Sequence, residues 1–363
     1  MQKIQSTQEK KHFILMSMLE RIIKYTEAIK EATDQMMEID PTIFVVGEGV
    51  SYKNGADGTT AGLKSKYPDR IFDVPLSEAG FTGMAVGSAL GGLHPIVHHG
   101  RVEFALFAAD AIFTQAGKWN YMFGGNNPVP VVFRVNIGRQ WGNGPQHTQA
   151  LYSLFGNALG LKVVIPATPH MAKGLLVSAL RDRNPVVMLE SRWIFNVKQE
   201  VSTEIFSEPL DKAKVTKKGK DLTLIAYGDG FISALESLSL LPNDVNVELI
   251  DLVSINPVDY KTIFKSLNKT GRLLCVDTTN EAFNIGGEII SKVAQNKSIN
   301  LKSKPHSLST PNVPCPTSTA LTEFYYPTKV DIANAVLGVL DKPKIKKKLT
   351  FEELHLAPNL TIK

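Results

Sequence analysis

The stretch DVPLSEAGFTGMAVGSAL, Asp73 to Leu90, decides the fold. An apolar strand gives way here to a segment of almost only small residues, and the polar pair Ser77 and Glu78 marks the change. Serine is a residue type that caps helices, and a carboxylate in the first turn interacts favourably with the helix dipole. The stretch predicts a strand followed by a helix. It also raises the question of why a carboxylate lies at the entrance of a segment made for burial.

The same alternation of strand and helix runs through the first half of the chain. Predicted strands are TIFVVGEG, DRIFDVPL, HPIVHHG, VPVVFRV, LKVVIPA and PVVMLES. Helical patterns lie between several of them, over residues 81–90, 104–122, 147–159 and 169–181. Nearly continuous apolar strands separated by helices are typical of a parallel sheet that is covered on both faces.

The length of 363 residues indicates two domains. A polar segment separates two regions of alternation, and the second region contains the shorter strands LTLIAYG, VNVELIDL and GRLLCVDT with helices near 231, 259 and 286. We therefore predict an N-terminal extension over 1–20, a larger α/β domain over 21–195 and a linker over 196–220. A smaller α/β domain over 221–341 and a basic tail over 342–363 follow.

Composition excludes several classes of protein. Two cysteines give no disulfide framework, which favours a reducing cytoplasm. The apolar run HFILMSML is interrupted by charges and lacks a cleavage site, so we interpret it as an extension that runs into an amphipathic helix. No apolar run reaches the roughly 20 residues that a membrane span needs. The net charge of +5 is modest, and the run KPKIKKK is expected to be a solvated terminus rather than a nucleic-acid site.

Known local motifs of catalysis are absent from the sequence. It contains neither the GxxxxGK[ST] loop of nucleotide triphosphate enzymes nor a GxSxG elbow. The histidines of HPIVHHG, which are His94, His98 and His99, lie in a predicted strand and cannot form a helical metal-binding pair. We therefore do not interpret them as a zinc site.

Three residues are candidates for chemistry. Glu78 lies at the carboxyl end of a strand, where open α/β sheets bind ligands. His147 lies in the glycine-rich loop GNGPQHTQA before a predicted helix, a position that suits proton transfer. Phe104 opens a helix after HHGRVE. Each also has a plainer explanation: Glu78 as a helix-entry residue capped by Ser77, His147 as an ordinary loop histidine and Phe104 as a core aromatic.

The order of these motifs resembles one family. It is carried by FVVGEGV, DVPLSEAGFTGMAVGSALGGLHPIV, KWNYMFGGNNPVPVVFRV, GPQHTQA, DLTLIAYGDGFISALESL and RLLCVDTTNEAFNIGGEI. The chain resembles, over about residues 21–340, the β subunit of the thiamine-diphosphate-dependent decarboxylating component of 2-oxoacid dehydrogenases, within the transketolase-like superfamily. The resemblance implies a three-layer, doubly wound parallel sheet that forms the pyrimidine-binding domain. It also implies a smaller α/β transketolase C-terminal domain.

The resemblance also implies roles for residues. Glu78 matches the family glutamate that hydrogen-bonds the aminopyrimidine of the cofactor and promotes loss of the thiazolium proton. Phe104 matches the aromatic residue that stacks on the aminopyrimidine. His147 matches a histidine near the reacting substrate, and Glu48 lies near the same pocket in relatives. A structural potassium ion is implied at the positions of Val131, Ala179, Leu180, Asp182 and Asn184.

The diphosphate half of the site has no match. Thiamine enzymes usually hold diphosphate and magnesium with GDG followed by NN, but the YGDG of residues 227–230 has no asparagine pair in register and lies in the second domain. We interpret this GDG as unrelated to the motif. The resemblance then implies that a separate α subunit holds most of the magnesium and diphosphate, in a heterotetramer of two α and two β subunits.

The loop NIGRQWGNGPQHTQ departs from the common family pattern. Arg139 is a candidate ligand for a substrate carboxylate, and Trp141 a candidate wall for a small acyl group, with structural packing an equal alternative for each. The acyl acceptor therefore stays open. The first hypothesis is oxidative decarboxylation of a 2-oxoacid with transfer to a lipoyl acyltransferase partner. Carboligation to an aldehyde, ketone or sugar is a second, and a non-catalytic scaffolding subunit is a third.

Overall fold

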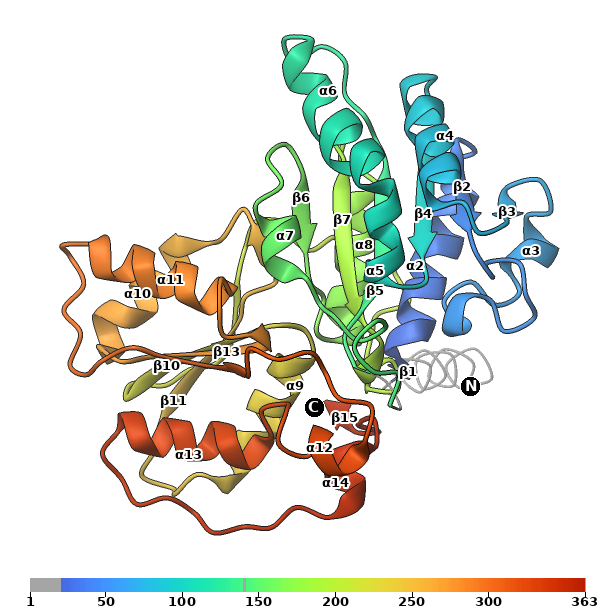
Figure 1. Cartoon of the computed structure of the whole chain (residues 1–363). Coiled ribbons are helices and arrows are strands. Elements are labelled where there is room, and N and C mark those ends of the chain that lie inside the picture. Colours follow the sequence, from blue (N-terminus) through green and yellow to red (C-terminus); the bar gives the residue numbers. More distant parts are fainter. Residues whose placement is uncertain (1–20, 140–141, 363) are drawn as a thin grey trace, which may run out of the picture.

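The computed structural model describes residues 21–139 and 142–362. The predicted extension over 1–20 lies outside these residues. Two main sheets, each flanked by helices, lie side by side and are joined by a third, small sheet near the N- and C-terminal segments (Figure 1).

The larger sheet has seven strands in the order β12-β6-β7-β5-β4-β2-β3. All neighbouring pairs are parallel except β12 and β6. β12 comes from the second half of the chain and pairs antiparallel with β6, so the second domain adds an edge strand to the first domain's sheet. The strands are β2 (Ile43–Gly47), β3 (Ile71–Asp73), β4 (His94–His99), β5 (Val132–Ile137), β6 (Lys162–Val164), β7 (Val186–Ser191) and β12 (Ser254–Asn256).

Helices cover both faces of this sheet (Figure 1). Small and apolar residues of α4 (Glu78–Leu90), among them Phe81 and Ala85, share one core with the strand residue Phe133. On the other face, α2 (Tyr25–Ile39) packs against α8 (Pro169–Ala179). The predicted three-layer α/β fold is confirmed. The remaining helical segments are η1 (Ala56–Gly58), α3 (Leu63–Lys66), α5 (Val102–Ala105), η2 (Leu106–Ala108), the π-helix η3 (Asp110–Ala116), α6 (Gly117–Met122), α7 (Tyr152–Gly156) and η4 (Arg192–Ile194).

The second sheet has the order β14-β13-β10-β11-β9, with only β9 antiparallel to its neighbour. It forms the predicted smaller α/β unit. Its strands are β9 (Lys214–Lys217), β10 (Leu222–Ala226), β11 (Val247–Asp251), β13 (Leu273–Asn280) and β14 (His306–Thr310). Its helical segments are α9 (Gly228–Ser237), η5 (Leu238–Leu240), α10 (Tyr260–Thr270), α11 (Ile285–Gln295), α12 (Thr319–Thr322) and α13 (Lys329–Val339).

Two predicted helices differ from the structure. The helix predicted over 147–159 forms only as α7, because Leu151 has a φ of +49° that interrupts the helix and leaves His147 in a turn. The helix predicted over 104–122 forms, but its middle is the π-helix η3. Such wide turns often occur at functional sites.

The segment over 196–220, predicted as a linker, is largely folded. β8 (Lys198–Glu200) pairs antiparallel with β1 (Ile22–Lys24), and β9 joins the second sheet. Val201 and Leu210 are buried. Apolar residues this widely spaced show no period in the sequence, so their burial becomes visible only when partners distant along the chain are in place.

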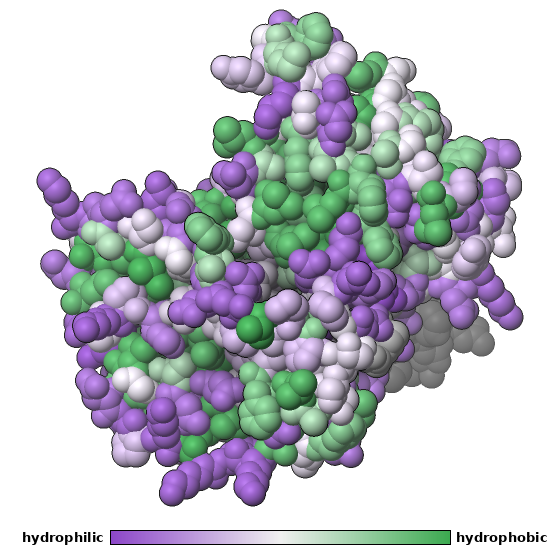
Figure 2. Space-filling view, viewed as in Figure 1, coloured by the Kyte–Doolittle hydropathy of each residue, from purple (hydrophilic) through white to green (hydrophobic). Residues whose placement is uncertain are grey.

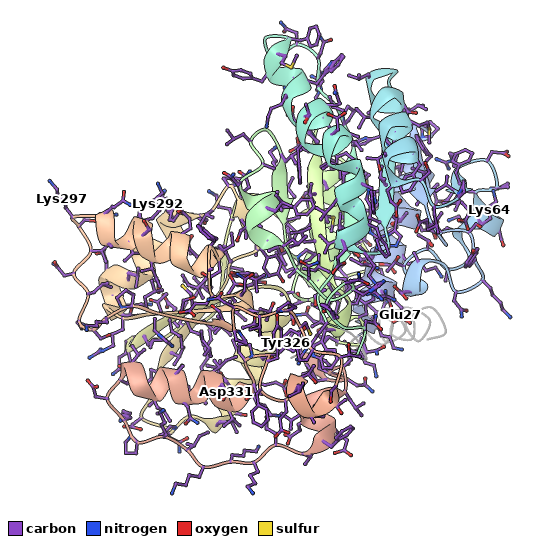
Figure 3. The ribbon with its side chains drawn as sticks, viewed as in Figure 1. Glu27, Lys64, Lys292, Lys297, Tyr326 and Asp331 are labelled. Carbon is purple, nitrogen blue, oxygen red and sulfur yellow. The ribbon has the colours of Figure 1, made fainter. Side chains whose placement is uncertain are left out.

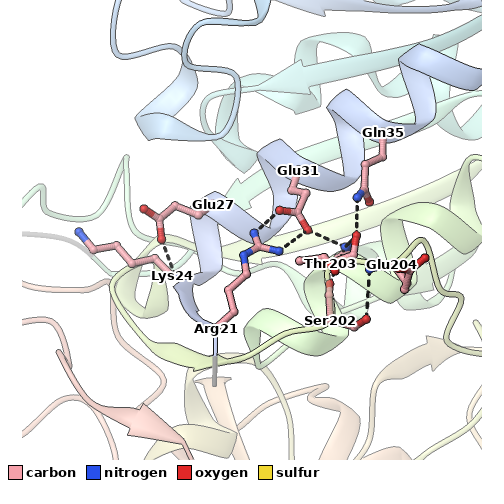
Figure 4. A network of polar contacts seen from close by, with 9 residues as sticks. Arg21, Lys24, Glu27, Glu31, Gln35, Ser202, Thr203 and Glu204 are labelled. Atoms are coloured by element: carbon pink, nitrogen blue, oxygen red, sulfur yellow. Dashed lines mark hydrogen bonds and ion pairs between the residues drawn. The ribbon is translucent and has the colours of Figure 1, made fainter. Parts of the chain in front are cut away.

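A polar network holds this segment to the first domain (Figure 4). The buried Lys173 ammonium donates to Glu31 Oε1 at 2.6 Å and to the Ser202 carbonyl at 2.7 Å. Arg21 also donates to Glu31, and Gln35 donates to the Thr203 carbonyl. Burial alone would raise the pKa of Glu31, but the hydrogen bonds from Arg21 and Lys173 outweigh it and lower that pKa.

The run KPKIKKK, predicted to be a solvated terminus, is the start of the tail over 342–363. Lys344 and Lys346 to Lys348 are exposed. The rest of the tail forms α14 (Phe351–His355) and β15 (Thr361–Ile362), and β15 pairs parallel with β8 of the first domain. The chain thus returns from the second domain to the first. Ile362 lies at the edge of the three-stranded sheet. Its apolar side chain is buried in the same core as residues of α2 and α8.

Candidate active site

The four residues predicted for the cofactor site lie at one edge of the larger sheet. Glu48 directly follows β2, and Glu78 opens α4 after β3. Phe104 lies in α5 after β4, and His147 lies in the loop after β5. These strands are neighbours in the order β5-β4-β2-β3 and run parallel. Their carboxyl ends therefore meet at the same edge, where open α/β sheets bind ligands.

Glu48 and Glu78 form a pair of interacting carboxyl groups. Burial raises the pKa of Glu48, and the negative charge of Glu78, a hydrogen bond with its carboxyl group and the charge of Asp73 raise it further. Glu48 Oε1 is buried and has no hydrogen-bond partner among the described residues. The pair therefore favours keeping a proton between two carboxylates and offers a free acceptor to a ligand.

The side chain of Ser77 does not cap α4. Its N-cap position carries no side-chain hydrogen bond, so the capping alternative for the Ser77–Glu78 pair is wrong in this respect. Asp73 instead binds the neighbouring turn, accepting from Gly49 N at 3.0 Å and from Ser51 Oγ at 2.7 Å. Asp73 was not among the predicted site residues. Its place at the end of an apolar strand, five residues before Glu78, was the signal that could have found it.

Phe104 and His147 contact each other. Their ring centroids are 5.4 Å apart with an interplanar angle of 85°, an edge-to-face arrangement. Both side chains are half-buried. Gln149 N donates to Glu103 Oε1 at 2.8 Å, which ties the loop of His147 to the helix of Phe104. The structure thus brings together two predicted site residues from different strand ends.

The loop of His147 rests on the second domain. Gly138 N donates to the Gln149 carbonyl at 2.8 Å and closes the base of the loop. Gly142 and Gly144 have φ values of +66° and +72°. A Cβ atom at Gly144 would lie 2.5 Å from Thr317 Oγ1, and one at Gly142 would lie 3.0 Å from the Thr317 carbonyl oxygen. Glycine is therefore required by both backbone conformation and close approach.

The guanidinium group of Arg139 lies over two aromatic rings. Its guanidinium carbon lies 3.9 Å from the ring centroid of Trp193 and 4.7 Å from that of Tyr326. Tyr326 lies at the junction of the two domains (Figure 3). Arg139 and Trp193 line two adjoining cavities of about 380 and 460 Å³, which residues of the tail also line. Trp141, the other loop candidate, lies outside the described residues.

The five positions predicted for potassium lie around the end of α8. Ala179 and Leu180 end this helix, and the Asp182 carboxylate accepts from Asn184 N at 2.9 Å and forms an ion pair with Lys162. The Val131 carbonyl accepts from the N–H of Val186, two residues after Asn184, at 3.0 Å. The five residues are thus close together, and potassium binding stays a prediction.

The histidines of β4 do not converge. His99 Nε2 contacts Thr82 Oγ1 at 3.2 Å, and burial lowers the pKa of His99 to about 3. Burial and the charge of Arg134 lower the pKa of His98 well below its usual value. Adjacent residues of a strand face opposite sides of the sheet, so these two rings lie apart.

Asp229 of the YGDG segment opens α9 in the second domain, where it is buried and accepts from Thr278 Oγ1 at 2.9 Å. Burial raises the pKa of Asp229, whereas the charge of Arg139 lowers it. Asp229 thus makes structural contacts at the junction of the two domains. None of the described helices is long and apolar enough to cross a membrane.

Two family models match most of the chain. Residues 21–196 match the model described as "Transketolase, pyrimidine binding domain", and residues 211–332 match "Transketolase, C-terminal domain". A solved structure described as "Split gene transketolase, inactive beta4 tetramer" has the same fold, with a TM-score of 0.72 at 22% identity. The match covers 88% of this chain and 98% of that one.

Curated relatives are more similar in sequence. A Cupriavidus necator protein named acetoin:2,6-dichlorophenolindophenol oxidoreductase subunit beta is 37% identical over 85% of this chain and 94% of its own length. A Porphyra purpurea protein named pyruvate dehydrogenase E1 component subunit beta is 38% identical over 88% of this chain and 97% of its own. A Saccharomyces cerevisiae pyruvate dehydrogenase E1 component subunit beta, named as mitochondrial, is 35% identical over 86% and 88%.

The mitochondrial relative leaves the cytoplasmic location a prediction. The domain models and the relatives together confirm the predicted family. The relatives are named for different substrates, so they do not decide between pyruvate and acetoin. The chain belongs to the family of β subunits of thiamine-diphosphate-dependent 2-oxoacid and acetoin dehydrogenases, built from a transketolase pyrimidine-binding domain and a transketolase C-terminal domain.

Proposed function

We propose that this chain supplies the pyrimidine half of a thiamine-diphosphate site in a dehydrogenase that cleaves a small 2-oxoacid or acetoin. The observation that carries the proposal is the interaction of Glu48 with Glu78 at the carboxyl edge of the sheet. A surface without a bound cation or ligand gains nothing from bringing two carboxyl groups together, because their repulsion weakens the fold. Such a pair is typical of a site that handles protons.

The residues at this edge fit the aminopyrimidine ring of the cofactor. Glu48 Oε1 is a buried acceptor without a partner among the described residues, and Glu78 stands beside it with its side chain half-buried. The half-buried ring of Phe104 offers a face for stacking on a flat heterocycle. When bound, thiamine diphosphate supplies the electron sink that lets a carbon–carbon bond beside a carbonyl break.

The side chains of this chain would orient the cofactor and move protons. Glu78 would place its carboxyl group against a ring nitrogen of the pyrimidine, and Glu48, whose pKa is raised by burial and by the charge of Glu78, would supply a neighbouring group that can hold a proton. His147, held edge-on against Phe104, would serve as a proton donor or acceptor at the substrate side. Arg139 and Trp141 remain proposals for the substrate side.

An unlike subunit would complete the site. Neither Glu48 nor Glu78 lines the two cavities beside Arg139 and Trp193. Two apolar side chains stand open beside the Glu48–Glu78 edge: Leu76, which is 80% exposed, and Phe107, which is 73% exposed. Hydrophobic surface gathers over the helices of the first domain on the face seen in Figure 2. Exposed apolar surface around a site is typical of an interface.

We infer that the covering partner is an α subunit, in a heterotetramer of two α and two β chains, and that it holds most of the magnesium and diphosphate. The relatives are named as β subunits, which supports an unlike partner. A lipoyl acyltransferase stays the proposed acyl acceptor. Carboligation has no observation in its favour, and the scaffolding alternative is opposed by the interacting carboxyl pair.

The function is tested with the complex purified after co-expression with its α subunit. Pyruvate and acetoin are the probes, 2,6-dichlorophenolindophenol is the electron acceptor, and dye reduction is the readout. Glu78→Gln should lower the rate by at least about a hundredfold. Glu200→Gln, at an exposed position at the end of β8, should leave it unchanged. A Glu78→Gln complex with wild-type rates on either probe would reject the proposed role and restore the scaffolding alternative.

Potassium is proposed at the end of α8. The last carbonyl oxygens of a helix have no N–H donor within the helix. Their partial negative charge favours binding of a monovalent cation. Asp182 and Asn184 are tied by a hydrogen bond at 2.9 Å, and Asn120 donates to Asn184 Oδ1 at 2.8 Å, so the turn is fixed. A higher Tm in KCl than in equimolar choline chloride, lost in Asn184→Ala, is expected. Equal Tm in both salts would remove the support.

A further inference from the structure

The stacked arginine carries a role beyond the proposed cofactor chemistry. Arg139 follows β5 and Gly138, so it belongs to the first domain and to the base of the loop that ends in His147. Trp193, whose ring centroid lies 3.9 Å from the guanidinium carbon, belongs to η4 of the first domain. Tyr326, whose ring centroid lies 4.7 Å from the same carbon, lies between α12 and α13 of the second domain. The arginine therefore contacts an aromatic ring of each domain.

The surroundings of Arg139 fix it as a structural cation. Its charge lowers the pKa of the buried Asp229 of the second domain, so the two groups attract each other across the junction. The Tyr326 hydroxyl contacts Cys315 Sγ at 3.3 Å, which orients the ring. A guanidinium over two rings contacts them through its planar surface, unlike a lysine ammonium at the same place.

The described part of the loop leans on the same domain. Gly142 and Gly144 lie directly against Thr317 with no space for a side chain. Thr148 Oγ1 donates to the Gly144 carbonyl at 2.7 Å, so a shift of Gly144 moves the turn that carries His147. His147 itself lies against Phe104 of the first domain. The loop thus contacts both domains.

We propose that Arg139 is a positioning residue: lying over the rings of Trp193 and Tyr326, it latches the His147 loop to the second domain and so fixes His147 against Phe104. This rests on the proposed function, because the chemistry of His147 is itself proposed. It is an alternative to the expectation that Arg139 binds a substrate carboxylate. The two roles predict different kinetic effects, since a substrate ligand acts on binding and a positioning residue acts on the geometry of the reacting groups.

Two readouts on the co-expressed complex test the latch. The first is kcat and KM for pyruvate and acetoin with the dye. The second is amide hydrogen exchange of residues 142–149, followed by mass spectrometry. Arg139→Ala and Arg139→Lys should each lower kcat about tenfold to a hundredfold with little change in KM, and should speed exchange in this segment alone. Tyr326→Ala should act like Arg139→Ala, whereas Tyr326→Phe keeps the ring and should act like wild type.

Arg272→Ala is the matched control, because Arg272 is a half-buried arginine that directly precedes β13 of the second domain and donates to the Asp221 carbonyl. It should change neither readout. A raised KM with unchanged kcat, rescued by Arg139→Lys, would identify a substrate ligand and overturn the latch. Unchanged exchange in both Arg139 variants would overturn it too, as would faster exchange throughout the first domain. If the wild-type complex turns over neither probe, the proposed function fails, and the exchange measurement still decides the latch.

Discussion

The ring of His147 lies edge-on to the ring of Phe104, with centroids 5.4 Å apart. These residues follow two different strands of one sheet and are 43 positions apart in the chain, as their numbers show. Their contact means that the surface proposed for the aminopyrimidine and the group proposed for the substrate side are set by a single packing interaction. A substitution at either residue should therefore change the position of the other ring.

Replacing Phe104 tests the stacking surface. Phe104→Ala removes the ring face and the edge contact with His147, so we expect thiamine diphosphate to bind the complex about tenfold more weakly. Titration calorimetry measures the Kd directly. Phe324→Ala, at a phenylalanine that is 79% exposed in the second domain, is the control and should leave the Kd unchanged. Equal Kd values for the Phe104→Ala complex and wild type would argue against stacking.

The carboxyl pair makes stability depend on pH. The pKa of Glu48 is raised in the folded protein, by burial first and by Glu78 second. The folded chain therefore holds this proton more tightly than the unfolded chain, and folding loses stability as pH rises above the unfolded glutamate pKa of about 4.3. Glu48→Gln removes the penalty, so Tm without cofactor should rise by about 1–2 °C at pH 8.

The same substitution should have a smaller effect at pH 5, because the cost of ionising Glu48 in the folded chain grows as pH rises. Differential scanning calorimetry of the cofactor-free chain at the two pH values measures the difference. Glu38→Gln, at an exposed glutamate on α2, serves as the control for loss of one surface charge. An equal gain at both pH values would show that repulsion between Glu48 and Glu78 is not the cause.

A buried ion pair holds the centre of the larger sheet. Arg134 donates to both carboxylate oxygens of Glu190, at 2.6 and 2.8 Å, and both side chains are completely buried. Glu190→Ala leaves the Arg134 charge buried without a partner and should cost about 3–5 kcal/mol in the free energy of unfolding. Urea denaturation measures this cost.

The double variant Arg134→Met with Glu190→Leu removes both charges together. It should be clearly more stable than Glu190→Ala, because no unpaired charge remains in the core. A double variant as unstable as Glu190→Ala would show that methionine and leucine pack poorly at this site. The cost of Glu190→Ala could then not be assigned to an unpaired buried charge.

Deleting residues 350–363 tests the returning tail. The deletion removes α14 and β15, including the buried Ile362, and leaves β8 with a free edge. We expect a loss of about 2–4 kcal/mol in the free energy of unfolding, measured in urea. Replacing Lys346, Lys347 and Lys348 by serine should leave stability unchanged, since these lysines are exposed. An unchanged midpoint after the deletion would mean that the tail contributes nothing.

The sequence by itself determined the layers and the entrance to the site. Buried parallel strands appear as apolar runs, and the helices between them have their own period, so the alternation is a local property of the chain. For the same reason Glu78, at a strand end before a small-residue helix, could be singled out from the sequence alone. His147 and Phe104 were also candidates from their places in the sequence, and the matched motifs added Glu48.

Only the tertiary structure decided which of these groups touch. The coupling of Glu48 to Glu78, the edge-to-face contact of Phe104 with His147 and the stacking of Arg139 on Tyr326 join residues from separate strand ends or separate domains. The return of the tail to β8 likewise pairs segments about 160 residues apart. The apolar period of a segment shows which of its residues face the core and which face solvent. It does not show which distant segment they pack against, because that depends on the packing of the whole chain.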